Sequence, residues 1–284
     1  MTLIVQLTDT HIVEPGELLY GKVDTAAHLA RSVQQINAMI PQPDVVLITG
    51  DLVEHPGVDT YEHFAGLIEP LNAPVYILPG NHDQPEIMRE YFRGSPVFPI
   101  DDGPTCQYVV DDFAVRILAL NSHMDNTELP HFGPRRLAWL RRELKASDKP
   151  TLIAIHHPPM VTGVEFIDMV GVDWFDGIAA QIAQHPQVQL VICGHGHSDI
   201  IGRISNVPVY MAGSTAHQLV AVRGNDHAPA FDVRPWPPVL HQWVSTGFVS
   251  GSHPWPSWVE DKRIDRESGL DWEVLKQRMR GSMK

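Results

Sequence analysis

The sequence has few of the features that mark secreted, membrane-spanning or nucleic-acid-binding proteins. It contains only two cysteines in 284 residues, Cys106 and Cys193, and these cannot build a disulfide framework. No apolar run approaches the length of a membrane span, and no basic leader opens the chain. Positive charge is also scarce: the formal net charge is -13, a field that repels nucleic-acid polymers and anionic membranes. We therefore expect a cytoplasmic protein with neither a membrane nor a nucleic-acid polymer as partner.

Apolar residues, by contrast, are plentiful enough for one large α/β core, because 43% of the chain is hydrophobic. Up to about residue 80, β-type runs alternate with segments of helical spacing, which predicts parallel strands joined by helices. A hairpin over 107–120 then begins a second sheet, and helices follow near 134–144 and 174–184. Short strands follow residue 200, at 207–211, 218–222 and 239–243, and a further helix is expected near 272–279. The pattern predicts a β-sandwich flanked by helices.

Five short polar motifs follow the apolar runs, so strand ends of one sheet edge can bring them together. They are Asp9-Thr10-His11, Gly50-Asp51, Gly80-Asn81-His82-Asp83, His156-His157-Pro158 and Gly194-His195-Gly196-His197. Each has an ordinary explanation when taken alone, such as a turn, a capped strand end or an exposed His. The joint occurrence of all five motifs has no such ordinary explanation, because carboxylates, an amide and several imidazoles together make up the ligand set of two adjacent divalent metal ions.

In this order the motifs resemble the signature of the calcineurin-like metallophosphoesterase superfamily, which runs D-x-H, G-D, G-N-H-D/E, H-x-P and G-H-x-H. The resemblance extends over nearly the whole chain. Within the superfamily, the sequence is most similar to the cyclic-nucleotide and glycerophosphodiester phosphodiesterases. It implies a four-layer α-β-β-α sandwich of two mixed sheets flanked by helices, with residues 1–249 forming the catalytic domain. It also implies an enzyme, a phosphoric diester hydrolase.

The resemblance implies a role for each motif residue. One divalent ion would be held by Asp9, His11, Asp51 and His197, and the second by Asp51, Asn81, His156 and His195, so that Asp51 bridges the two. The ions would be iron, manganese, cobalt or zinc, a choice that this donor set leaves open. His82 would contact the phosphoryl group together with Asn81 and protonate the leaving oxygen, and His217 would bind substrate. Asp83 or another nearby acid would orient the His ligands.

We expect the substrate to be a small phosphodiester, either a 3',5'-cyclic nucleotide or a glycerophosphodiester, attacked by a metal-bound hydroxide. With two ions, two carboxylates and a hydroxide, the site would carry a charge of about +1, which matches a diester better than a dianionic monoester. No Lys or Arg lies within the motifs, although Arg203 and Arg223 could fold inward. A phosphomonoesterase or nucleotidase with the same metals, and a non-catalytic scaffold, remain alternatives.

The segment 250–284 differs in composition from the rest of the chain. It is rich in Trp and Pro, with Trp255, Trp258 and Trp272, and it is too apolar to be a free tail. We expect it to pack on the protein or lie at a subunit contact, and so to make the protein a homo-oligomer.

Overall fold

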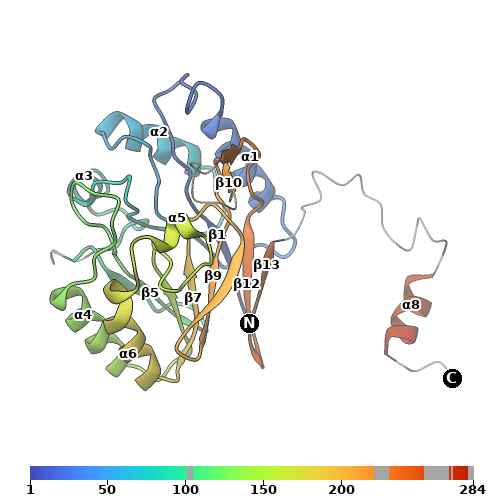
Figure 1. Ribbon diagram of the computed structural model, residues 1–284. Coiled ribbons are helices and arrows are strands. Elements are labelled where there is room, and N and C mark those ends of the chain that lie inside the picture. Colours follow the sequence, from blue (N-terminus) through green and yellow to red (C-terminus); the bar gives the residue numbers. More distant parts are fainter. Residues whose placement is uncertain (101–104, 221–229, 253–268, 270, 281–284) are drawn as a thin grey trace. The chain divides into compact units, whose positions relative to one another are not determined.

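The computed structural model describes residues 1–100, 105–220, 230–252, 269 and 271–280 (Figure 1). The chain divides into two compact units, Met1–His253 and Pro254–Lys284. The first unit contains both large sheets and all five polar motifs. No helix within the described ranges is long and apolar enough to cross a membrane.

The first sheet has five strands in the order β13-β12-β1-β2-β3. Their bounds are β1 Thr2–Leu7, β2 Val45–Thr49, β3 Val75–Leu78, β12 Val239–Val244 and β13 Gly247–Ser252. The pairs β1–β2 and β2–β3 are parallel, which confirms the β-α-β-α-β prediction. Strands β12 and β13 join antiparallel beside β1 and make the sheet mixed.

The second sheet has six strands in the order β4-β5-β6-β7-β9-β8. Their bounds are β4 Tyr108–Val110, β5 Arg116–Ala119, β6 Thr151–Ala154, β7 Val188–Cys193, β8 Ile200–Ile204 and β9 Val207–Met211. The predicted hairpin is β4–β5, and it does begin this sheet. Strands β5, β6, β7 and β9 run parallel, so their carboxyl ends lie along one edge.

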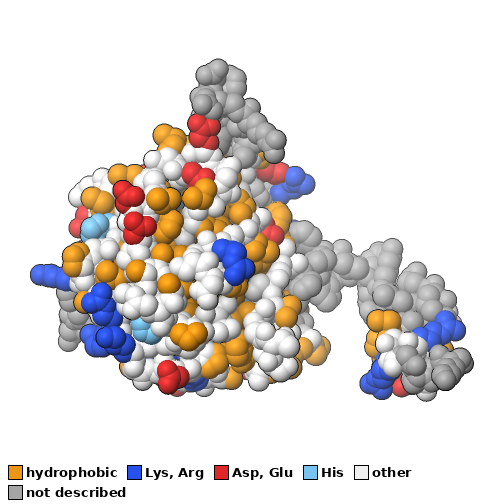
Figure 2. Space-filling model, turned by 60° about the horizontal axis from the view of Figure 1, so that its bottom comes forward, with side chains coloured by type: hydrophobic (Ala, Val, Ile, Leu, Met, Phe, Trp, Pro, Cys, Tyr) orange, Lys and Arg blue, Asp and Glu red, His pale blue; other side chains and the backbone are white. Residues whose placement is uncertain are grey.

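Helices cover the outer faces of the two sheets, as predicted (Figure 1). On the first sheet lie α1, Thr25–Asn37, and α2, Val58–Ile68. On the second lie α4, Pro134–Lys145, and α6, Asp176–Gln184, whose buried residues share one core with β5, β6 and β7. Shorter helical segments are α3, Pro85–Tyr91, α5, Glu165–Asp168, and the 3-10 turn Asp173–Phe175. On the face in Figure 2, hydrophobic side chains are spread among polar ones over much of the surface.

A buried polar cluster joins the inner faces of the two sheets. Gln6 of β1 donates from Nε2 to Thr49 Oγ1 at 2.8 Å and to the carbonyl of Cys193, at the end of β7, at 2.9 Å. His241 of β12 donates from Nε2 to Gln6 Oε1 at 2.9 Å and accepts from Ser250 Oγ at 2.8 Å. Burial lowers the pKa of His241 to about 3, so this imidazole is a neutral part of the sandwich.

Several elements were missing from the sequence prediction. Strands β8, β11 (Ala230–Asp232) and β13, and helices α3 and α5, were not predicted, whereas β10 (Gln218–Val220) and β12 were. The predicted helix 174–184 is a 3-10 turn followed by α6. Trp255, Trp258 and Arg223 lie outside the described residues. In the second unit, the predicted terminal helix is α8, Trp272–Met279.

Candidate metal centre

The polar motifs meet at one edge of the sandwich because they follow the carboxyl ends of strands in both sheets. Hydrogen bonds hold the first two loops together: Asp9 N donates to the carbonyl of Gly50 at 3.0 Å, and His11 N donates to that of Asp51 at 2.9 Å. The loop after β7 joins them, since His195 N donates to both carboxylate oxygens of Asp9, at 3.0 and 3.1 Å. The two sheets therefore contribute side chains to one centre.

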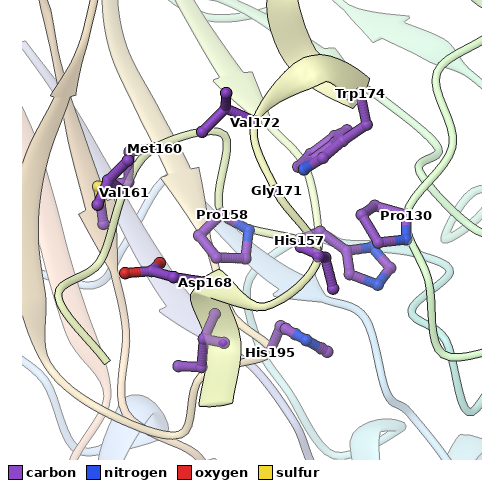
Figure 3. Close-up of a pocket in the computed structure, with 12 residues that line it drawn as sticks. Pro130, His157, Pro158, Met160, Val161, Asp168, Gly171, Val172, Trp174 and His195 are labelled. Carbon is purple, nitrogen blue, oxygen red and sulfur yellow. The ribbon is translucent and has the colours of Figure 1, made fainter. Parts of the chain in front are cut away.

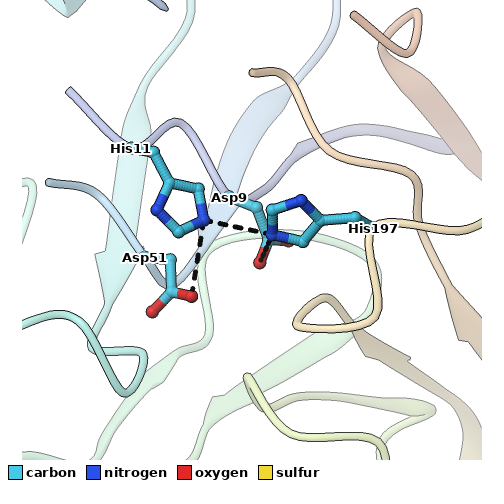
Figure 4. A group of neighbouring side chains, drawn as sticks. All are labelled: Asp9, His11, Asp51 and His197. Atoms are coloured by element: carbon cyan, nitrogen blue, oxygen red, sulfur yellow. Dashed lines mark hydrogen bonds and ion pairs between the residues drawn. The ribbon is translucent and has the colours of Figure 1, made fainter. Parts of the chain in front are cut away.

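Four of the predicted ligands form the first group, Asp9, His11, Asp51 and His197, and it is fully buried (Figure 4). One ligand atom from each lies within 4.8 Å of the others. His197 Nε2 lies 3.2 Å from Asp9 Oδ1, and His11 Nε2 lies 3.7 Å from Asp51 Oδ2. The geometry is that of a pocket for a single cation.

The second group contains Asp51, His156 and His195, with Asn81 beside it. His156 Nε2 lies 3.3 Å from Asp51 Oδ2 and 3.0 Å from Asn81 Oδ1. His195 Nδ1 lies 2.9 Å from the same Asn81 oxygen. Asp51 belongs to both groups, so the structure brings all seven predicted ligands together and places this carboxylate between two adjacent sites.

The backbone is strained where these side chains meet. Asp9, His11, Asp51, His195 and His197 all adopt φ angles between 42° and 68°, a left-handed region that non-glycine residues seldom occupy. Such conformations persist only where the surrounding structure imposes them, and they concentrate at functional sites. Five of the seven candidate ligands therefore have strained backbone conformations at the edge of the sandwich.

Two glycines make the close approach of the loops possible. A Cβ on Gly80 would collide with the backbone nitrogen and carboxylate of Asp51, and one on Gly50 would collide with the His156 ring. Gly50 also has φ +93°, which a side chain would strain. The Gly-Asp and Gly-Asn-His motifs thus need glycine for packing as well as for their turns.

The orientation of three imidazoles is set by hydrogen bonds at Nδ1. His11 Nδ1 lies 2.7 Å from Glu54 Oε2, His156 Nδ1 lies 2.8 Å from the carbonyl of Thr49, and His197 Nδ1 lies 3.0 Å from that of His217. All three partners are acceptors, so in the neutral ring Nδ1 carries the proton and Nε2 presents its lone pair to the centre. Anchoring of this kind is typical of metal-ligating histidines.

These lone pairs show that the centre is built for cations. His11 Nε2 and His197 Nε2 face each other at 3.1 Å, and His156 Nε2 faces oxygens of Asp51 and Asn81. Acceptors this close repel one another unless a positive charge lies between them. Oxygen and nitrogen donors without a thiolate suit manganese, iron, cobalt or zinc, so the residues present fit a pair of divalent ions.

The pKa values of Asp9, Asp51 and His156 also show that the two carboxylates attract positive charge. Burial alone would raise the pKa of Asp9, but His197 outweighs it and lowers that pKa to about 2. Burial likewise opposes ionisation of Asp51, yet His156 holds its pKa well below the ordinary value. In return, Asp51 overcomes the effect of burial on His156 and raises its pKa to about 9. Burial and the neighbouring His156 lower the pKa of His195 to about 3.

Sequence reasoning missed Glu54, which the structure places at the centre. Its carboxylate lies 2.7 Å from His11 Nδ1 and 3.4 Å from His82 Nδ1, and these three residues form a third cluster. The signal was weak: an acid three positions after Asp51 looks like an ordinary loop residue. Only the parallel pairing of the loops after β1 and β2, with Glu54 N bonded to the carbonyl of Ile12, brings it onto His11.

Asp83, one of the nearby acids expected to orient a histidine, has other hydrogen-bond partners in the structure. Its carboxylate accepts hydrogen bonds from Gly80 N at 2.8 Å, from Leu52 N at 3.2 Å and from Tyr61 Oη at 3.1 Å. Asp83 therefore ties the loop after β3 to the loop after β2. Burial, followed by the charge of Asp51, raises its pKa to about 6. Among the nearby acids, Glu54 has the role expected of Asp83.

His82 and His217 lie next to the two groups without belonging to the four-residue pocket. His82 is partly exposed; its backbone N–H donates to Asp51 Oδ1 at 2.9 Å, and its ring makes an edge contact with that of His11. His217 is buried against the rings of His11 and His197. Burial and His197 lower its pKa to about 3. The roles of both residues toward substrate stay predictions.

Comparison with known proteins agrees with this architecture. Residues 2–199 match the family described as calcineurin-like phosphoesterase. The chain is 29% identical to the glycerophosphodiester phosphodiesterase GpdQ of Enterobacter lignolyticus, over 92% of this chain and 96% of the relative. It is 30% identical to the 3',5'-cyclic adenosine monophosphate phosphodiesterase CpdA of Pseudomonas aeruginosa, over 69% and 70%. A dimetal phosphatase from Danio rerio has the same fold, with a TM-score of 0.61 at 13% identity over 89% of this chain and 99% of that one.

The matched region contains all five polar motifs and both groups of clustered ligands. These residues are positioned for a two-metal site, and the chain as a whole has the predicted pair of mixed sheets flanked by helices. This chain belongs to the calcineurin-like phosphoesterase family of metal-dependent enzymes.

Proposed function

We propose that this protein is a dinuclear metal phosphodiesterase that hydrolyses small phosphodiesters. The observation that carries the proposal is the shared position of Asp51, which belongs to two adjacent groups of buried ligands. In this assignment Asp9, His11 and His197 complete one site. Asn81, His156 and His195 complete the other.

Two divalent ions bound there would activate a water and neutralise charge on the phosphoryl oxygens. The chain's own residues supply the rest. Glu54 holds His11 in its tautomer through the 2.7 Å contact at Nδ1. His82, partly exposed beside His11, would donate a proton to the leaving oxygen in this proposal. Its pKa supports this role: burial works against the charged form, but Asp51, Glu54 and Glu128 together raise it.

The charges around the site favour a diester over a monoester. Within the described residues, the ion pairs of Asp9 and Asp51 are with histidines alone. Arg203 is exposed and donates to the carbonyl of Asn206 rather than to the centre. Glu128 adds negative charge, with its carboxylate in contact with Asn81 Nδ2 and 3.8 Å from His82 Nε2. Apart from the metal ions and the histidines, a second charge on the substrate therefore finds no Lys or Arg among these ion pairs of the described residues.

Matched nitrophenyl esters test the proposal. Methyl para-nitrophenyl phosphate and para-nitrophenyl phosphate share a leaving group and differ in charge. The metal-loaded protein should show the higher kcat/KM for the diester, and a chelator should abolish both reactions reversibly. A preference for the monoester would replace the diesterase with a phosphomonoesterase. Metal uptake without turnover of either ester would support a scaffold.

We also propose properties beyond the reaction itself. The ions are manganese, iron, cobalt or zinc, in keeping with an oxygen and nitrogen donor set. Both cysteines are free and buried, which suits the reducing cytoplasm. We propose that the segment 250–284 forms a subunit contact in a homo-oligomer; Trp272, which is half exposed on α8, supports this. Light scattering of the full chain at micromolar concentration tests the last point, and a monomer would overturn it.

A further inference from the structure

Asn81 differs from the other candidate ligands of the second group because only one end of its side chain can bind a metal ion. The amide oxygen offers lone pairs, whereas the NH2 group can only donate hydrogen bonds. A half-turn of the amide exchanges the two ends with almost no change in shape. In the structure Asn81 Oδ1 faces the centre, 2.9 Å from His195 Nδ1 and 3.0 Å from His156 Nε2. This orientation is the one that can serve a cation.

Glu128 holds the amide in this orientation from the side away from the centre. Asn81 Nδ2 donates a hydrogen bond to Glu128 Oε2. His82 Nε2 lies farther from the same carboxylate, at 3.8 Å, which is beyond hydrogen-bond distance. A carboxylate only accepts hydrogen bonds, so a half-turn of the amide would set two oxygens against each other. Glu128 therefore disfavours the orientation in which Asn81 cannot bind a metal ion.

The backbone of Glu128 is fixed by a buried histidine, although its side chain is 71% exposed. His157 Nε2 donates to the carbonyl of Glu128 at 3.2 Å, so in the neutral ring His157 Nδ1 accepts from Ser122 Oγ at 2.8 Å. His157 and Pro130, from the same loop as Glu128, both line a small cavity beside His195 (Figure 3). His157, a motif residue outside both ligand groups, thus anchors the loop that presents Glu128 to Asn81.

We propose that Glu128 is a positioning residue for the second metal ion: it holds the Asn81 amide oxygen toward the centre and so raises the affinity of that site. The inference rests on the proposed function for the presence of two ions, and it adds a residue from outside the five motifs. Glu128 acts through Asn81 rather than by binding the ion. Without Glu128, ordering the amide would cost part of the free energy of metal binding.

The charge of Glu128 offers a competing explanation, since any nearby carboxylate attracts cations. The two explanations predict different patterns. A charge acts on both adjacent ions, because Coulomb interactions fall off slowly with distance. The orientation of Asn81 acts on the second group alone, because Asn81 has no place in the group formed by Asp9, His11, Asp51 and His197.

Calorimetric titration of the chelator-treated full chain with Mn²⁺ distinguishes these patterns. In Glu128→Ala, one of the two association constants should fall about tenfold while the other keeps its wild-type value. Glu128→Gln keeps an accepting oxygen and loses the charge, so both constants should stay within about threefold of wild type. Glu165→Ala removes the same charge from an exposed position of α5, and this control should bind both ions as the wild type does.

Asn81→Asp provides a second test, because it removes the need for orientation. A carboxylate has an oxygen at each end, so either orientation can bind a metal ion. In the Asn81→Asp background, the further change Glu128→Ala should no longer weaken the binding of either ion. A tenfold loss that persists in this background would show that Glu128 does not act through the Asn81 amide, and the proposal would be overturned.

The outcomes separate this inference from the proposed function. Two ions bound by the wild type and equally well by Glu128→Ala would overturn the positioning role alone. So would equal losses at both sites in Glu128→Ala and Glu128→Gln, which would identify a charge effect. The expected pattern of Mn²⁺ binding without turnover of methyl para-nitrophenyl phosphate would remove the proposed function and leave the positioning role. A wild-type protein that binds a single ion would remove both.

Discussion

Glu54 offers the sharpest test of how the centre holds its ligands. Its Oε2 lies 2.7 Å from His11 Nδ1 in a buried setting, and Glu54→Ala leaves that N–H without its partner. A hydrogen bond to a charged group contributes about 1.5–3 kcal/mol, which corresponds to about a 10- to 150-fold loss of metal affinity. Glu54→Gln keeps an accepting oxygen and loses only the charge, so its affinity should lie between the two.

Calorimetric titration of chelator-treated protein with Mn²⁺ measures these affinities. Glu69→Ala, at an exposed acid after α2, is the control and should bind as the wild type does. Glu54 Oε2 also lies 3.4 Å from His82 Nδ1, so kcat of Glu54→Ala should stay low even at saturating metal. If Glu54→Ala binds Mn²⁺ with wild-type affinity, the carboxylate does not position His11 and this reasoning is refuted.

Three further predictions follow from other parts of the structure. Asp51→Ala should lose both ions together, since Asp51 belongs to both groups; elemental analysis finding one ion retained would contradict the bridge. Glu128→Gln should raise kcat/KM for para-nitrophenyl phosphate several-fold and leave kcat/KM for the methyl diester nearly unchanged. Equal changes in kcat/KM for the two esters would exclude a role of Glu128 in selecting substrates by charge. In the folded protein His241 stays neutral down to its pKa of about 3, whereas its ordinary pKa is 6.5. Between these two values the unfolded chain therefore binds a proton that the folded protein does not, and the free energy of unfolding falls as the pH drops. Between about pH 7 and pH 4.5, urea unfolding should show the wild type losing about 2.5 kcal/mol more than His241→Gln, and parallel losses would refute this.

The parts of the fold that could be predicted are those with a strong local pattern. Apolar runs that end in Gly-Asp or Gly-Asn-His identify both strand ends and candidate ligands, and the parallel β1, β2 and β3 follow from the helices between them. Strand β13 has no such pattern. Gly247 and Gly251 interrupt it, and its pairing with β12 depends on the sheet already being present.

The clustering of the candidate ligands could be predicted from the sequence, and the side chains that support them less so. Asp83 adjoins the Asn-His pair in sequence, which made it an obvious candidate to orient a histidine. The side chain instead points to backbone N–H groups of two loops. Glu54 acts on His11 across 43 positions of the chain, a contact that arises only from parallel strand pairing.

In the proposed function, buried side chains around Asp51 hold two metal ions for phosphodiester hydrolysis. Metal titration of the chelator-treated protein, with turnover of methyl para-nitrophenyl phosphate followed at each addition, tests it most directly. Activity should rise to a plateau at about two equivalents of metal per chain. Full activity with one equivalent or none, or two ions bound with no turnover, would contradict a dinuclear phosphodiesterase.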